Sequence, residues 1–365
     1  MVKLKVAVGP ISNLRGGVGG VSKNIVKFSK HNTEIFRAPF HLSFYQKLVD
    51  TDIFKKHMRF REKIWFNDPY SLYLAKVWLK NFDVIQMMGA PGYPGVFSEI
   101  GKSNSKYVYR IPGFYYLQGR KRFDSMHLSK KIDALMVKFC RKADAIVVTT
   151  PWYVSFLKKR YNLNSHLIGN SVDTELWGSG KASRFEKKFG IDRGFCLHTG
   201  TLTATKNPCM FVEISRAFPE KRFVMIGMGV EEKAVRILCN SNLPDNLFIL
   251  GRLGGEDLLD AYKASHVLLS DEPSIWGGNT VMEAMASGTI PVRAYHPSYP
   301  KDDFFFTDQK NGFLFEHRNF QDCKNMIERA WTEADMGKRA QNIAQEKHDW
   351  SEGILKYDDL YSSLV

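Results

Sequence analysis

The segment from 265 to 293, SHVLLSDEPSIWGGNTVMEAMASGTIPVR, constrains the fold of this chain more than any other. Its short apolar run at Val267–Leu269 predicts a buried strand, which Asp271 ends. A second strand begins at Ile290, and the residues between the two strands have the spacing of a helix. The segment therefore predicts a strand–helix–strand unit, which is typical of parallel sheets.

The start of this helix is a candidate binding site for an anion. Gly277 and Gly278 predict a tight turn, Asn279 is expected to cap the helix, and Gly288 is expected to end it. The backbone N–H groups near Thr280 would then be unpaired at the positive end of the helix dipole. The alternative is an ordinary strand–helix–strand unit with a glycine turn and no ligand.

A second segment, FCLHTGTLTATKNP at 195–208, supports the binding interpretation. It predicts a strand that ends at Gly200, followed by a helix with Lys206 at its start. Lysine in that position would add a positive charge at the start of the helix. Glu283, one turn into the later helix, could accept hydrogen bonds from sugar hydroxyls.

Strands and helices alternate along the whole chain. We expect two Rossmann-like α/β domains whose parallel sheets face a central cleft, with ligands at the carboxyl ends of the strands. The expected strands cover 3–9, 34–38, 82–87, 106–111, 144–149, 195–199, 222–227 and 246–250, and the expected helices cover 21–31, 127–142, 151–160, 207–218, 230–239, 255–264 and about 350–363.

Composition indicates a globular protein of two or three domains. The chain has 365 residues, of which 44% are hydrophobic and 25% charged. Its apolar runs are too short to span a bilayer, and the N-terminus reads as a strand and not as a signal peptide. The five cysteines, at 140, 196, 209, 239 and 323, show no metal or redox spacing, so we expect reduced thiols and a cytoplasmic protein.

Charge is concentrated in the first half of the chain. Residues 1–168 hold 29 Lys and Arg against 10 Asp and Glu, a net charge of +19, and the remainder carries −5. Such a field favours an anionic partner, such as a membrane surface or a lipid phosphate. The sequence shows no nucleic-acid-binding motif, so we expect no nucleic acid.

Residues 52–66, DIFKKHMRFREKIWF, could form a basic amphipathic helix on a membrane surface. The alternative is a helix that packs its apolar face on its own sheet. We therefore allow for a peripheral location on the inner face of the membrane.

In their order and spacing, these motifs resemble the family 4 retaining glycosyltransferases, which have the GT-B architecture. The resemblance implies an N-terminal acceptor-binding domain at 1–170, joined by the C-terminal helix at 349–365, which crosses back to it. A nucleotide-sugar-binding domain at 171–348 would follow. The motifs that carry it are GGVGG (16–20), KADAIVVTTPWYVSFLKKRYN (142–162), NSVDTELW (170–177), 195–208, RFVMIGMG (222–229), 265–293 and the terminal WSEGILKYDDLYSSLV.

The same resemblance assigns roles to residues. Lys206 would bind the diphosphate and Glu283 the ribose, and these two are the catalytic candidates. The loop at Gly251–Leu253 would contact the base, and Gly19 and Arg110 would lie on the acceptor or sugar side. The implied donor site comprises Gly16, Gly17, Gly200, Thr201, Lys206, Arg252, Leu253, Gly277, Gly278, Asn279, Thr280 and Glu283.

The chain departs from the family pattern at three places. Thr201 replaces an arginine that would face the diphosphate, and Ile275 replaces a glutamate that binds the donor sugar. The third is a histidine of the N-terminal domain, whose matching strand end holds Arg110, a residue that could supply the lost charge.

No metal or other cofactor is expected. Asp50 and Asp52 spell the Asp-x-Asp of metal-dependent glycosyltransferases, but they precede a helical pattern, where Asp52 suits a helix cap.

The resemblance implies a retaining, metal-independent hexosyltransferase that uses a UDP-, GDP- or ADP-sugar. Its acceptor would be a glycan, a lipid-linked glycan or a small molecule, in glycolipid or cell-surface polysaccharide synthesis. The alternative is a non-catalytic protein of the same fold that binds a nucleotide sugar or acts as a scaffold. A dinucleotide oxidoreductase fits poorly, because no acidic residue stands about twenty residues beyond GGVGG.

Overall fold

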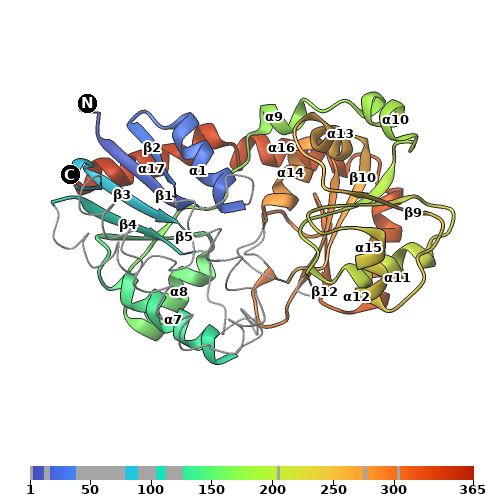
Figure 1. Ribbon diagram of the computed structural model, residues 1–365, viewed down its shortest axis with the longest axis horizontal. Helices are drawn as coiled ribbons and strands as arrows, with labels where there is room; N and C mark the ends of the chain where they lie inside the picture. The colour runs from blue at the N-terminus through green and yellow to red at the C-terminus, as the bar shows by residue number, and fades with distance from the viewer. Residues whose placement is uncertain are drawn as a thin grey trace. The chain divides into compact units, whose positions relative to one another are not determined.

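The protein is described by a computed structural model that covers residues 3–11, 17–37, 79–88, 104–111, 126–203, 206–273, 278–301 and 305–365. The chain divides into two compact units (Figure 1). The first unit is Met1–Gly169 with Ser351–Val365, and the second is Asn170–Trp350. Each unit contains one six-stranded parallel sheet, which confirms the predicted α/β fold with two Rossmann-like sheets.

The sheet of the first unit has the strand order β2-β1-β3-β4-β5-β6. Every residue of β3 and β5 is buried, as expected for strands that are covered on both faces. The strands are β1 (Lys5–Ile11), β2 (Asn32–Arg37), β3 (Val84–Met88), β4 (Lys106–Arg110), β5 (Ala145–Val148) and β6 (His166–Leu167), and the helices of this part are α1 (Gly17–Phe28), α7 (Met126–Cys140) and α8 (Pro151–Tyr161).

Helix α1 begins four residues before the predicted start at 21. Gly17, Gly19 and Gly20 therefore lie in its first turn. Gly16 lies outside the described residues. The error arises because glycine is a poor helix former, so that propensity alone placed the helix start too late.

Helix α17 (Trp350–Leu364) completes the first unit, although it follows the second unit in sequence. Asp358 accepts hydrogen bonds from the Ser29 hydroxyl at 2.6 Å and from the Lys30 backbone N–H at 3.0 Å. The Tyr361 hydroxyl donates to Gln86 on β3. In Figure 1 the red helix accordingly lies beside the blue strands of the first sheet.

The sheet of the second unit has the order β12-β11-β10-β7-β8-β9. Its strands are β7 (Phe195–Thr199), β8 (Phe223–Ile226), β9 (Leu247–Gly251), β10 (Ser265–Ser270), β11 (Ile290–Tyr295) and β12 (Phe313–Glu316). Its helices are α9 (Thr174–Gly178), α10 (Ala182–Phe189), α11 (Pro208–Ala217), α12 (Glu232–Cys239), α13 (Glu256–Ala264), α14 (Asn279–Ser287), α15 (Phe320–Thr332) and α16 (Met336–Lys347).

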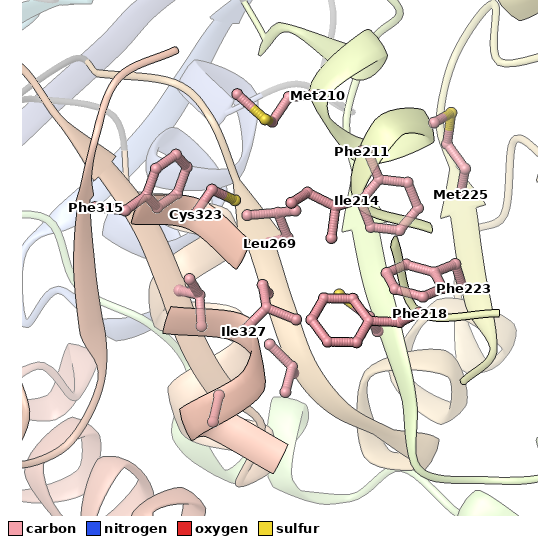
Figure 2. Close-up of a cluster of buried hydrophobic side chains, with 14 of the residues drawn as sticks. Met210, Phe211, Ile214, Phe218, Phe223, Met225, Leu269, Phe315, Cys323 and Ile327 are labelled. Atoms are coloured by element: carbon pink, nitrogen blue, oxygen red, sulfur yellow. The ribbon is translucent and has the colours of Figure 1, made fainter. Parts of the chain in front are cut away.

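Two apolar clusters hold the helices on the two faces of this sheet. Figure 2 shows one of them, in which Phe211 of α11 and Ile327 of α15 pack with Leu269 of β10. In the other cluster, Tyr262 of α13 and Met282 of α14 are fully buried. Among the described residues, no helix combines the length and the apolar character needed to cross a membrane.

A disulfide joins Cys209 in α11 to Cys239 at the end of α12, with their Cα atoms 5.2 Å apart. The expectation that all five cysteines are reduced is therefore wrong for this pair. Sequence spacing could not reveal it, because the two cysteines are 30 residues apart and meet only when both helices pack on the sheet. Cys140, Cys196 and Cys323 are free and buried.

We predict that reduction destabilises the second unit. Closing a loop of this length removes conformational freedom from the unfolded chain, which stabilises the fold by about 3 kcal/mol. Dithiothreitol should therefore lower the free energy of unfolding of the wild-type protein, measured in urea. It should have no effect on the Cys209→Ser, Cys239→Ser double variant. Equal sensitivity of the two proteins would contradict a disulfide in solution.

Candidate functional site

The candidate site lies where the strand order of the second sheet reverses. β7 is the first strand of this sheet in sequence, and β8 and β10 flank it on opposite sides. Ligands of open parallel sheets bind outside the carboxyl ends of the strands at such a point. Here these ends carry Gly200 after β7 and Asp271 after β10.

Lys206 lies at this edge and is the predicted diphosphate ligand. Gly200 has φ 143°, and a Cβ atom in its place would overlap the Lys206 side chain. Lys206 Nζ lies 3.7 Å from Glu272 Oε2, and both side chains are mostly buried. Glycine at position 200 therefore lets the lysine fold over the strand end, beside a carboxylate that sequence reasoning missed.

A buried carboxylate supports the chain next to Lys206. Asn207 adopts a left-handed conformation with φ 41°, and its Nδ2 donates to Asp271 Oδ2 at 2.5 Å. Asp271 Oδ1 lies 2.6 Å from Nδ1 of His317, which follows β12. Asp271 thus ties β10 to the start of α11 and to the end of β12. Neither Asp271 nor His317 was predicted, although Asp271 directly follows a strand at the expected edge.

His198 on β7 adds no positive charge to this site at neutral pH. Its side chain is buried and packs on Phe211 with the ring centroids 5.3 Å apart. Burial, reinforced by the charge of Lys206, lowers the pKa of His198 to about 4.

Glu283 lies on α14 and is partly buried. The Tyr262 hydroxyl donates to its Oε2 at 3.0 Å, and the same hydroxyl lies 2.7 Å from Thr199 Oγ1. Burial raises the pKa of Glu283 to about 7, and the Tyr262 hydrogen bond and the charge of Lys206 limit that rise. The positive charge of Lys206 therefore acts on Glu283, the second catalytic candidate.

The start of α14 differs in one respect from the sequence prediction. The cap is Gly278, which has no side chain that could cap the helix, and Asn279 is the first residue of the helix. A Cβ atom at Gly278 would overlap the ring of Phe305, so packing selects glycine there. Thr280 lies in the first turn, and Gly277 and Ile275 lie outside the described residues.

The remaining donor-site candidates follow β7 and β9. Thr201 is exposed beyond Gly200, and Arg252 is exposed beyond Gly251. Leu253 is partly buried against the second apolar cluster. These positions place the loop after β9 at the same edge of the sheet as Lys206, and its contact with a base stays a prediction.

The first unit contains the candidates for the acceptor or sugar side, in β4 and α1. Arg110 is buried at the end of β4, and its Nε donates to the Tyr357 hydroxyl of α17 at 3.0 Å. Arg110 is therefore not a surface residue. Gly17 and Gly19 lie in α1, and contact of any of these residues with an acceptor stays a prediction.

The described residues contain no group of three or more His, Cys, Asp or Glu side chains that could hold a metal ion. Asp50 and Asp52, together with the predicted helix at 52–66, lie outside those residues.

Comparison with known structures assigns the fold. Sucrose-phosphate synthase from Thermosynechococcus elongatus superimposes with a TM-score of 0.73 at 15% identity, over 100% of this chain and 99% of that one. The Anabaena protein HepE in complex with UDP-glucose gives a TM-score of 0.72 at 15% identity, over 99% and 100%. The chain therefore has the GT-B fold.

The second unit also matches a sequence family. Residues 181–347 match the family model of the glycosyl transferases group 1. The poly(ribitol-phosphate) α-N-acetylglucosaminyltransferase of Staphylococcus aureus is 24% identical over 303 residues, which are 80% of this chain. The matched part is 58% of the length of that transferase. The match therefore does not show that this chain has the activity of the whole transferase.

The pKa of Glu283 leads to a prediction about stability. Because the folded state raises this pKa from 4.5 to about 7, it binds the proton more tightly than the unfolded state, and the unfolding free energy falls as the pH rises from 4.5 to about 7. Glu283→Gln cannot titrate. Between about pH 5 and about pH 8, wild type should therefore lose about 2 kcal/mol of unfolding free energy relative to the variant.

Urea unfolding at the two pH values measures this difference. Glu328→Gln, at an exposed position of α15, is the matched control and should show the same pH dependence as wild type. Parallel curves for wild type and Glu283→Gln would show that the environment of Glu283 is not the one described.

Proposed function

We propose that the protein is a glycosyltransferase that moves a sugar from a nucleotide diphosphate to an acceptor. The observation that carries this proposal is that Lys206 and Glu283 both lie at the carboxyl edge where the strand order reverses, with the lysine charge acting on the carboxyl group. The GT-B fold and the match to glycosyl transferases group 1 support it.

In the proposed reaction, the bond between the sugar and the diphosphate breaks while negative charge grows on the leaving phosphate. Lys206 and the backbone N–H groups at the start of α14 would stabilise that charge. We further propose retention of the anomeric configuration, by a front-face mechanism in which the leaving phosphate oxygen helps to deprotonate the acceptor. No resident metal takes part in this scheme.

The donor is proposed to be a UDP-, GDP- or ADP-sugar and the acceptor a glycan, a lipid-linked glycan or a small molecule. The Anabaena structure with UDP-glucose supports the first proposal, and the polymer acceptor in the name of the Staphylococcus aureus transferase supports the second. Synthesis of a glycolipid or a cell-surface polysaccharide would use such substrates.

A second candidate function is binding of a nucleotide sugar without catalysis. Thr201 favours it, because a neutral side chain stands where the family resemblance implies a cation for the diphosphate. Release of nucleotide from the donor, with or without acceptor, separates the two functions, since a binding protein releases none.

Lys206→Met tests the catalytic proposal. This variant removes the charge and keeps an aliphatic side chain against Gly200. Turnover of the best nucleotide sugar should fall by about 100-fold or more, because one transition-state contact of this kind contributes about 3 kcal/mol. Lys187→Met, at an exposed position of α10, is the control and should keep wild-type turnover.

Near wild-type turnover by a folded Lys206→Met protein would contradict the proposed donor site. The same assay in EDTA checks metal independence, because a loss of activity that a divalent ion restores would reinstate Asp50 and Asp52 as metal ligands.

We also propose that the basic first half of the chain binds an anionic membrane surface. The protein should sediment with anionic lipid vesicles and not with neutral ones. Binding should weaken as salt rises from about 0.05 to about 0.5 M, because the Debye length falls from about 14 to about 4 Å. Replacing Lys55, Lys56, Arg59 and Lys63 by Gln should cost about 1 kcal/mol for each charge at the surface.

Indifference to lipid charge would leave the +19 as a solubility field and the acceptor in solution. A lower melting temperature of Trp65→Ala without a change in vesicle binding would assign residues 52–66 to the core of the fold.

A further inference from the structure

A chain of three oxygen atoms leads from the end of β7 to Glu283. Thr199 Oγ1 lies 2.7 Å from the Tyr262 hydroxyl, which lies 3.0 Å from Glu283 Oε2. Thr199 directly precedes Gly200, and Tyr262 projects from α13. The chain therefore connects the two strand–helix segments that supply the catalytic candidates.

The number of available hydrogens determines which oxygen donates in each of these two hydrogen bonds. A tyrosine hydroxyl has one hydrogen, and an ionised carboxylate can only accept. Tyr262 donates its hydrogen to Glu283, so the Thr199 hydroxyl must donate to Tyr262. Each oxygen in the chain then has a partner, and every hydrogen bond points towards the carboxylate.

The tyrosine is held in place by its surroundings. Its side chain is fully buried, and the ring of Trp177 packs edge-on against it with the centroids 5.0 Å apart. Burial raises the pKa of Tyr262 well above its usual value, so this hydroxyl stays neutral and remains a donor.

These hydrogen bonds involve only one of the two carboxylate oxygens of Glu283. Within the described part of the protein, Oε2 receives the Tyr262 hydrogen bond, and Oε1 has no partner. Oε1 is not fully buried, so solvent or a ligand can reach it. The carboxylate is therefore held at one oxygen and open at the other.

We propose that Thr199 and Tyr262 are positioning residues that aim the Glu283 carboxylate, so that Oε1 accepts a hydrogen bond from a ribose hydroxyl of the nucleotide. This inference rests on the proposed donor site. It adds that ligand binding is coupled to the ionisation of Glu283, because a carboxylate accepts from a hydroxyl more strongly when it is charged.

The surrounding charges support this coupling. Helix α14 packs on α9, α13, α16, β10 and β11, and in the described part of these elements Tyr262 is the titratable group that acts on Glu283. Lys206, which precedes α11 and lies against Gly200 at the end of β7, is the charged group that does so. Tyr262 and Lys206 both favour the ionised form, whereas burial opposes it and raises the pKa to about 7.

Titration calorimetry tests the proposal. UDP, GDP and ADP are screened with wild type, and the tightest of the three is measured from about pH 5.5 to about pH 9. Wild-type affinity should rise with pH and level off above the pKa of Glu283. Tyr262→Phe removes only the hydroxyl, and near pH 7 it should weaken binding by about tenfold. The midpoint should move upwards, and part of the loss should remain at high pH, because the ionised carboxylate is then no longer held by the hydroxyl.

Thr199 offers a matched pair of variants. Thr199→Val loses the hydroxyl at nearly constant shape, and should shift the midpoint in the same direction as Tyr262→Phe. Thr199→Ser keeps the hydroxyl and should restore wild-type behaviour. This pair also tests the chain if Tyr262→Phe fails to fold.

Glu283→Gln separates positioning from a merely structural role. Its affinity should be weak and should keep only the pH dependence that comes from titration of the terminal phosphate of the nucleotide, and adding Tyr262→Phe to it should cause no further loss. An equal loss in both backgrounds would show that Tyr262 acts through the fold and not through Glu283, and would overturn the inference.

The failure of the inference differs from the failure of the proposed function. If wild type binds none of the three nucleotides, the proposed donor site is wrong, and the ribose contact is wrong with it. If wild type binds a nucleotide and the Thr199 and Tyr262 variants keep its affinity and pH midpoint, only the positioning role is wrong.

Discussion

The pairing of β7 with β10 is the interaction on which the site depends. Leu197 lies opposite Leu268 in this parallel pair, and that register places the two strand ends side by side. Side chains alternate along β7, so that His198 packs on α11 while Thr199 reaches Tyr262 on α13. A shift of one residue would send Thr199 to the wrong face of the sheet and separate it from Glu283.

The charges at this edge are balanced before any ligand binds. Lys206 faces Glu272 at 3.7 Å, so the lysine already has a negative neighbour. The carboxylate of Asp271 is hydrogen-bonded to Asn207 and His317 instead of being paired with the lysine. A diphosphate that binds Lys206 would exchange one anionic neighbour for another, and its affinity would depend on the difference between the two interactions.

Local patterns in the sequence predicted most of the fold and part of the site. Apolar runs and glycine punctuation located the strands, and the topology then placed Lys206 at the sheet edge. Asn279 was misplaced by one residue, because packing against Phe305 and not capping chemistry decides where α14 begins. Tyr262 and the Cys209–Cys239 disulfide could not be predicted, since each depends on which helices become neighbours in the folded second unit.

Helix α17 has a consequence for the order of events during synthesis. The ribosome makes the six strands of the first sheet early, but the helix that supplies Tyr357 and Tyr361 to that unit emerges only after the whole second unit. Until then Arg110 and Gln86 lack the hydroxyl partners that they have in the folded protein. The second unit is continuous in sequence and can fold first, so the N-terminal unit should be the last to reach its final structure.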